Sequence, residues 1–184
     1  MCVIIYKPAG ALIPSENELF MAHRIHPHGC GFISSSGLHY RGLDYNKFLT
    51  LLQMVPIEDE CIIHFRFATH GSVKKSNCHP FEKNGVWFAH NGILDIAPIG
   101  DKTDSETAFL KYIYPMIHDY GINSYETFEV IDGIIGGSKF AIMVDGSVSI
   151  FGHFYEHEGR MYSNTRHLVQ EKYYSDIFTR IWGK

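Results

Sequence analysis

The residue with the clearest potential for covalent chemistry is a cysteine one position from the start of the sequence, Cys2. An initiator methionine is usually removed when the second residue is small, and removal of Met1 would leave a thiol and a free α-amine on one residue. A thiol with a pKa of ~8.5 can lose its proton to an amine with a pKa of ~8. Cys2 would then be a nucleophile with its own general base. The alternative is a cysteine that only packs in the first strand.

The dipeptide Asn91-Gly92 is the second candidate, and it lies between two short apolar runs. Asn-Gly between such runs is typical of a type I′ hairpin turn. The same pair can form an oxyanion hole, because an asparagine amide and a glycine backbone N–H can both point at one developing negative oxygen. The pattern alone leaves both interpretations open.

Two residues of opposite charge, Arg66 and Asp104, could bind the two ends of a zwitterion. Arg66 stands in an otherwise apolar run, where it either points to solvent or grips a carboxylate with its guanidinium group. Asp104 precedes a helical pattern, where it is either the helix N-cap or a partner for a substrate ammonium group.

Four residues near position 26 have types and spacing that resemble a metal site: His23, His26, His28 and Cys30. A structural zinc site needs a second, similarly spaced pair of ligands, and none is obvious. We therefore interpret these residues as a His-rich surface loop and expect no metal. The sequence contains no Walker-type loop, so we also expect no ATP and no other cofactor.

Hydrophobic periodicity and turn signals predict the elements that must position these residues. Ser15 and Glu18 have capping-box spacing, Asp44 can cap a second helix, and Asp145-Gly146 is a strong hairpin signal. Helices come in pairs between antiparallel hairpins, which predicts an α+β layered fold rather than βαβ alternation. The predicted strands are 2–6, 29–34, 38–41, 61–67, 86–90, 138–144, 147–151 and 161–163, and the predicted helices are 15–26, 44–54, 104–121 and 125–131.

Length and composition bound the class of protein. The 184 residues predict one domain over 1–184, and 45% hydrophobic residues are enough for a substantial core, which excludes a disordered chain. A net charge of −4 with no basic cluster gives no reason to expect nucleic-acid binding. No apolar stretch is long enough for a membrane span and no secretory signal is present, so we expect a cytoplasmic protein. Cys30, Cys61 and Cys78 are then expected to be reduced packing residues.

The joint order of the motifs resembles the class II glutamine amidotransferase domain, the glutaminase of the N-terminal nucleophile (Ntn) hydrolase superfamily. The match is strongest over residues 2–110 and extends to about residue 165, and Gly29-Cys-Gly-Phe-Ile33 is similar to an early strand of the family. In order along the chain, the motifs are Cys2, Arg66-Phe-Ala-Thr-His-Gly71, Asn77-Cys-His-Pro80, His90-Asn-Gly92 and Thr103-Asp-Ser-Glu106.

This resemblance implies a four-layer αββα sandwich of two antiparallel sheets between helix layers. It also implies that the Cys2 thiolate attacks the side-chain amide of glutamine, forming a γ-glutamyl thioester and releasing ammonia. The implied domain stands alone, and a separate synthase subunit would receive the ammonia. The implied roles are Asn91 and Gly92 in the oxyanion hole, Arg66 on the α-carboxylate, Asp104 on the α-ammonium group, and Thr69, His70 and His79 with Pro80 in a loop that covers glutamine.

Two positions depart from the family pattern. Val3 stands after the nucleophile, where the family commonly has glycine, and Phe67 stands where the sugar-phosphate members usually have tryptophan. Two other functions remain as alternatives: an Ntn hydrolase that cleaves another amide, such as a γ-glutamyl conjugate, and a non-catalytic binding or metal-binding module.

Overall fold

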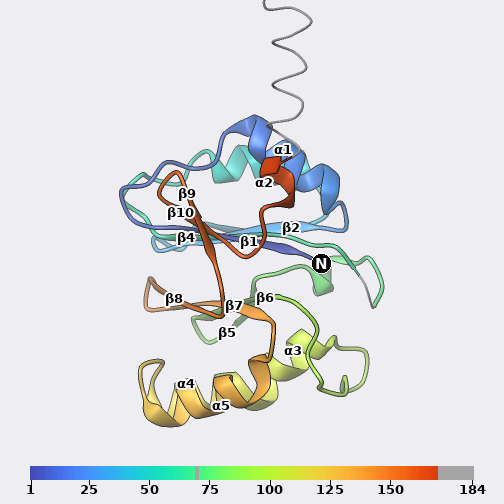
Figure 1. Ribbon diagram of the computed structural model, residues 1–184, viewed down its shortest axis with the longest axis vertical. Coiled ribbons are helices and arrows are strands. Elements are labelled where there is room, and N and C mark those ends of the chain that lie inside the picture. The colour runs from blue at the N-terminus through green and yellow to red at the C-terminus, as the bar shows by residue number, and fades with distance from the viewer. Residues whose placement is uncertain (69–70, 170–184) are drawn as a thin grey trace, which may run out of the picture.

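Two antiparallel sheets lie face to face between two layers of helices in the computed structural model, which describes residues 1–68 and 71–169 (Figure 1). The first sheet has the strand order β3-β2-β4-β1-β10-β9 and the second has the order β5-β6-β7-β8. The strands are β1 (Val3–Lys7), β2 (Cys30–Ser34), β3 (His39–Gly42), β4 (Cys61–Phe65), β5 (Phe81–Lys83), β6 (Val86–Asn91), β7 (Lys139–Val144), β8 (Ser147–Phe151), β9 (Tyr155–His157) and β10 (Arg160–Tyr162).

Helices α1 and α2 cover the outer face of the first sheet, and α3, α4 and α5 cover the outer face of the second (Figure 1). The predicted α+β, four-layer αββα architecture is therefore confirmed. The helices are α1 (Glu16–Ile25), α2 (Tyr45–Leu52), the short 3₁₀ turn η1 (Lys75–Asn77), α3 (Asp104–Ala108), the π-helical turn η2 (Phe109–Ile113), α4 (Tyr114–Tyr120) and α5 (Tyr125–Ile135).

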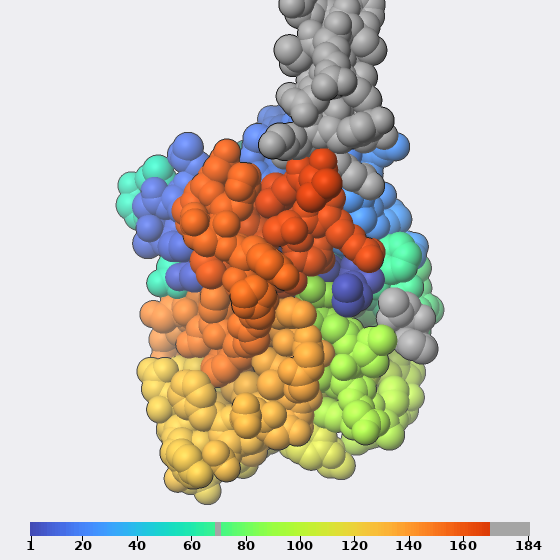
Figure 2. Space-filling view, viewed as in Figure 1, coloured from blue at the N-terminus to red at the C-terminus, as the bar shows by residue number. Residues whose placement is uncertain are grey.

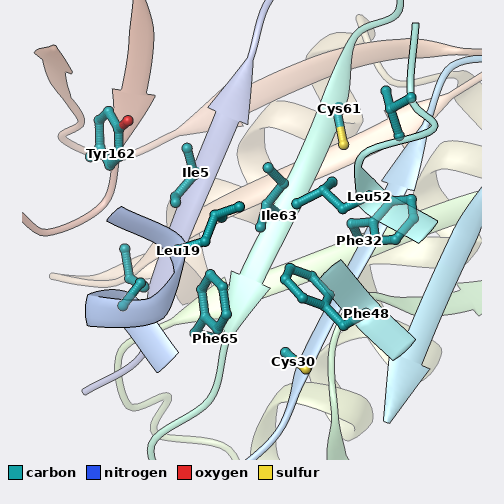
Figure 3. Packing of buried hydrophobic residues seen from close by; sticks show 13 residues of the cluster. Ile5, Leu19, Cys30, Phe32, Phe48, Leu52, Cys61, Ile63, Phe65 and Tyr162 are labelled. Carbon is teal, nitrogen blue, oxygen red and sulfur yellow. The ribbon is translucent and has the colours of Figure 1, made fainter. Parts of the chain in front are cut away.

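The period-2 alternation of each strand divides the interior into three cores. In β1, Val3 and Ile5 pack towards α1 and α2, whereas Ile4 packs between the two sheets. The core under α1 and α2 is rich in aromatic rings, such as Phe48 and Phe65 (Figure 3). Burying one such side chain stabilises the fold by about 2 kcal/mol. A third core, between the second sheet and its helices, is built around Phe88.

Several predicted caps and turns are confirmed. Ser15 Oγ accepts a hydrogen bond from Glu18 N at 3.1 Å, and Asp44 Oδ1 accepts one from Lys47 N at 3.0 Å. Asp145 and Gly146 have φ values of 50° and 80° in the turn between β7 and β8, as a type I′ turn requires. The Glu18 carboxylate, however, does not close a capping box on Ser15; it accepts hydrogen bonds from Arg160 and Tyr162 in a buried network.

Cys30, Cys61 and Cys78 are buried and free, which confirms their predicted packing role. Burial raises the pKa of the Cys30 and Cys61 thiols, so these groups stay protonated. The strands β5 and β9, each three residues long, were not predicted. Within residues 1–68 and 71–169, no helix is both long and apolar enough to cross a membrane.

Candidate active site

The predicted site residues that the structure describes meet at one edge of the sandwich, where strands of both sheets end. Cys2 directly precedes β1, Arg66 directly follows β4, and Val3 pairs with Phe65 between them. In the second sheet, Asn91 is the last residue of β6. Figure 2 shows the dark-blue N-terminal end reaching the surface between the red-orange segment near residue 165 and the light-green segment after β6.

A cavity of about 380 Å³ opens at this edge and contains most of the predicted residues. Asn91 lies just behind Gly92, with its side chain turned towards β10. Thr69 and His70 lie outside the described residues, so their predicted roles stay predictions. The cavity is lined by Cys2, Arg66, His79, Gly92 and Asp104, among others.

The Cys2 sulfur lies against the backbone after β4, where it accepts a hydrogen bond from Phe67 N at 3.3 Å. Burial raises the pKa of the Cys2 thiol, and the Phe67 N–H, the Met1 ammonium group and Arg66 oppose this shift only in part. The thiol therefore stays protonated near neutral pH. A nucleophile at this position needs a base to remove its proton.

Gly92 is required by two constraints on its backbone. Its φ of 148° is a conformation that residues with a side chain rarely adopt. A Cβ on Gly92 would also lie 2.1 Å from Ser138 Oγ. The alternative in which Asn91-Gly92 forms a hairpin turn is wrong: β6 pairs with β5 and β7, and after Asn91 the chain leaves the sheet through residues 92–103.

Arg66 is only 4% exposed, so the alternative in which it points to solvent is wrong. Its Nη1 donates to Ser72 O at 3.1 Å, and Asn77 Nδ2 donates to the same oxygen at 3.0 Å. Through the Ser72 carbonyl, the guanidinium group therefore contacts the 71–80 segment, which contains His79.

Asp104 is not the helix N-cap that the sequence suggested. Thr103 is the N-cap of α3, because its Oγ1 accepts from Glu106 N at 3.1 Å. This shift of one residue frees the Asp104 carboxylate for other contacts. Its Oδ2 accepts from Leu94 N at 3.1 Å and its Oδ1 from Ser105 N at 2.7 Å, so a fixed carboxylate faces the cavity.

The Gly-x-Gly pattern of Gly29 and Gly31 provides space for the end of the 71–80 segment. A Cβ on Gly31 would lie 2.1 Å from the His79 backbone oxygen, and one on Gly29 would lie 2.4 Å from Cys78 Sγ. The two glycines therefore let Cys78 and His79 rest directly on β2. The sequence pattern contained these glycines but did not reveal what they contact.

Three buried histidines, His64, His79 and His90, lie together at the site, and His79 and His90 line the cavity. The rings of His64 and His79 are 4.4 Å apart, and His64 Nε2 lies 3.2 Å from His90 O. Burial lowers the pKa of His64 to about 3 and also lowers the pKa values of His79 and His90. For His90, the nearby Asp104 carboxylate opposes this shift. All three are neutral at pH 7.

These three histidines predict a loss of stability in acid. A histidine whose folded-state pKa is depressed binds its proton first in the unfolded state, so stability falls as the pH drops below ~6.5. We expect the free energy of unfolding to fall between pH 6.5 and pH 5, by about 1 kcal/mol per pH unit for each histidine. Urea denaturation at pH 7, 6 and 5 measures this slope.

The variant that tests this assignment is His64→Gln, which should reduce the slope by about one proton whatever its effect on overall stability. A flat stability profile from pH 7 to pH 5 would contradict the assignment.

The residues around position 26 do not form the surface loop that we expected. His26 is 1% exposed and its Nδ1 lies 2.8 Å from Ala22 O, and Cys30 belongs to the core under α1 and α2. His23 stacks on Tyr45 with ring centroids 4.5 Å apart, and His28 Nδ1 accepts from Ala68 N at 2.9 Å. The four residues therefore contact four different parts of the structure.

Comparisons with known proteins agree with this geometry. Residues 46–135 match the family described as "Glutamine amidotransferases class-II". A curated relative, the isomerizing glutamine–fructose-6-phosphate aminotransferase of Rhizobium leguminosarum bv. viciae, is 27% identical over 129 residues, or 63% of this chain. The chain spans only 21% of that relative's length.

The fold also resembles a solved structure, the glutamine phosphoribosylpyrophosphate (PRPP) amidotransferase from B. subtilis in complex with ADP and GMP. The TM-score is 0.58 at 14% sequence identity, and the match covers 94% of this chain and 44% of that chain. The similarity extends to nearly all of the sandwich described above.

Proposed function

The chain carries a class II glutamine amidotransferase domain, and from that premise we propose that it hydrolyses the side-chain amide of glutamine with Cys2 as the nucleophile. The observation that carries the proposal is a single cavity lined by four groups. They are the Cys2 thiol, the Gly92 backbone, the Arg66 guanidinium group and the Asp104 carboxylate. These are the four groups that hydrolysis of a zwitterionic amide requires.

Substrate binding follows from the charges of free glutamine. Its α-carboxylate would bind the guanidinium of Arg66, and its α-ammonium group would bind the carboxylate of Asp104. His79 lines the cavity at the far end of the predicted covering loop, and Thr69 and His70 of that loop would close over the bound amino acid. The side-chain amide then reaches Cys2.

Catalysis begins with the removal of Met1, which frees the α-amine of Cys2. The amine takes the thiol proton, and the thiolate adds to the amide carbon of glutamine. The negative oxygen of the tetrahedral intermediate accepts hydrogen bonds from Gly92 N and the Asn91 amide. Collapse breaks the C–N bond, the protonated amine gives its proton to the departing nitrogen, and ammonia leaves. Water then attacks the γ-glutamyl thioester and releases glutamate and the thiol.

The ammonia would pass to an acceptor bound by a separate synthase subunit. The relatives support an acceptor site outside this domain, because each is much longer than the region that matches this chain.

Labelling with an electrophilic glutamine analogue, read out by intact mass, tests the proposal. We expect the mass of a chain without Met1, and one adduct located on Cys2 by peptide mapping. Cys30, Cys61 and Cys78 serve as internal controls because they are buried. Failure to label Cys2, or equal labelling of the buried thiols, would contradict the proposal. A faster rate on γ-glutamyl amides than on glutamine would identify a different amide as the substrate.

The role of Asp104 predicts a change in substrate preference. Glutaramate is glutamine without its α-amino group, so it lacks the charge that Asp104 would bind. A hydrogen bond to a charged group contributes about 1.5–3 kcal/mol, so the wild type should prefer glutamine over glutaramate by about 10- to 100-fold in kcat/KM. Asp104→Asn should remove most of this preference, mainly by raising KM for glutamine.

Steady-state kinetics on both substrates measures the effect, with Asp95→Asn as the matched control. Asp95 is an exposed aspartate in the same 92–103 segment and does not line the cavity. An Asp104→Asn variant that keeps the full preference for glutamine would show that another group binds the ammonium.

A further inference from the structure

Ser163 directly follows β10, and it connects the strand of the nucleophile with the rest of the site. Its backbone N donates to Ile4 O at 2.9 Å, and its Oγ accepts from Ile4 N at 2.7 Å. The side chain is only 3% exposed. Ile4 is two residues from Cys2, so Ser163 binds β1 close to the nucleophile.

The same hydroxyl oxygen reaches across to the other sheet. Ser163 Oγ accepts a hydrogen bond from Asn91 Nδ2 at 2.9 Å, over a sequence separation of 72 residues. Asn91 is 2% exposed, and in the structure Ser163 is the partner of its side-chain nitrogen. The neighbouring residue, Asn164, donates from its Nδ2 to the backbone oxygen of Cys2.

We propose that Ser163 is a positioning residue that fixes the plane of the Asn91 amide relative to Cys2, an inference that rests on the proposed function. An amide nitrogen carries two hydrogens. With one held by Ser163 Oγ, the other has a fixed direction and can act as a preorganised donor for the oxyanion. Such a donor is effective because it does not reorganise when charge develops.

The burial of the pair makes this hydroxyl hard to replace. A buried amide without its partner would rotate to find another one, since unsatisfied buried polar groups are costly. Ser163 acts on Asn91 and not on the reacting atoms, so its removal should weaken oxyanion stabilisation while substrate binding by Arg66 and Asp104 stays intact.

The first test is the kinetics of Ser163→Ala. We expect kcat for glutamine to fall about 10-fold or more, with KM changed less than about threefold, because the lost interaction acts in the transition state. Alkylation of Cys2 by iodoacetamide should stay within about twofold of the wild-type rate. In that reaction the S–C bond forms as iodide leaves, so no oxyanion develops. An unchanged kcat, or a parallel fall in turnover and alkylation, would overturn the proposal.

A double-mutant cycle gives the second test. Asn91→Ala should lower kcat by about 10²- to 10³-fold. If Ser163 acts through Asn91, the double variant should be no slower than Asn91→Ala by more than about twofold. Multiplied effects of the two substitutions would mean that Ser163 acts independently of Asn91, which overturns the proposal.

Two further arms keep the result decisive. Ser34→Ala removes another buried serine, at the opposite end of the first sheet, and should leave kcat unchanged. If Ser163→Ala does not fold, Ser163→Cys replaces it, because a thiol has nearly the shape of a hydroxyl but its sulfur is a weak hydrogen-bond acceptor. We expect the same fall in kcat at constant KM. An unchanged kcat overturns the proposal.

A final measurement separates this inference from the proposed function. If the wild-type protein does not hydrolyse glutamine, the proposed function fails, and NMR exchange of the Asn91 side-chain amide protons decides the role of Ser163. Faster exchange in Ser163→Ala than in the wild type supports the positioning role, and equal exchange overturns it.

Discussion

A Cys2→Ser chain should release glutamate from glutamine at least ~10³-fold more slowly than the wild type, because the nucleophile and its base act as one unit. A serine hydroxyl is far less acidic than a thiol, so an α-amine with a pKa of ~8 cannot generate useful amounts of its anion. The substitution changes one atom, and Arg66 and Asp104 remain in place. Glutamine should therefore still bind, with an affinity within a few-fold of the wild-type value.

Glutamate release in a coupled assay and glutamine binding by calorimetry measure the two halves of this expectation. The control is Cys61→Ala, because Cys61 is buried and lies opposite Lys7 in the strand register, at the far end of β1 from Cys2. It should keep turnover in the folded fraction. Cys2→Ser turnover within tenfold of the wild-type rate would exclude Cys2 as the nucleophile.

A chain with a residue kept in front of Cys2 should be as inactive as Cys2→Ser. An amide nitrogen cannot accept the thiol proton, and burial already raises the pKa of the Cys2 thiol, so little thiolate would form. Inserting a glutamate between Met1 and Cys2 provides such a chain, because a large second residue prevents methionine removal. We expect a loss of about 10³-fold or more in kcat.

The matched control uses the same polypeptide before and after cleavage. A leader that ends in a protease site directly before Cys2 blocks the α-amine, and cleavage frees it. Activity should appear in proportion to the cleaved fraction seen by intact mass. Full turnover by the uncleaved chain would show that the α-amine is not the catalytic base.

The linear sequence was sufficient for most elements of the fold. Short apolar runs with β-branched and aromatic residues predicted the long strands, and Asp145-Gly146 predicted its hairpin, because these signals depend on neighbouring residues. The order of the motifs then indicated the four-layer sandwich and the site. The tight turn that Asn91-Gly92 also permitted does not form, because β6 pairs with β5 and β7 and the chain leaves the sheet after Asn91.

Most of the features that sequence reasoning missed depend on contacts between distant residues. Ser163 lies 159 residues from Ile4 and 72 from Asn91, and no local pattern marks such pairs. The buried histidines are a similar case, since their burial depends on how the two sheets close over them. Asp104 was displaced from the N-cap by Thr103, a competition between adjacent residues that propensities do not resolve.

The core between the two sheets separates the molecule into two halves, each made of one sheet and the helices that cover it. Cys2 and Arg66 belong to the half with α1 and α2, and Gly92 and Asp104 belong to the half with α3 to α5. The side chains that fill the core between the sheets include small ones, such as Ala89 and Ala141. Under the proposed mechanism, glutamine hydrolysis requires the residues of both halves, and neither half would perform it alone. An opening between the two sheets would therefore stop turnover while both halves kept their secondary structure.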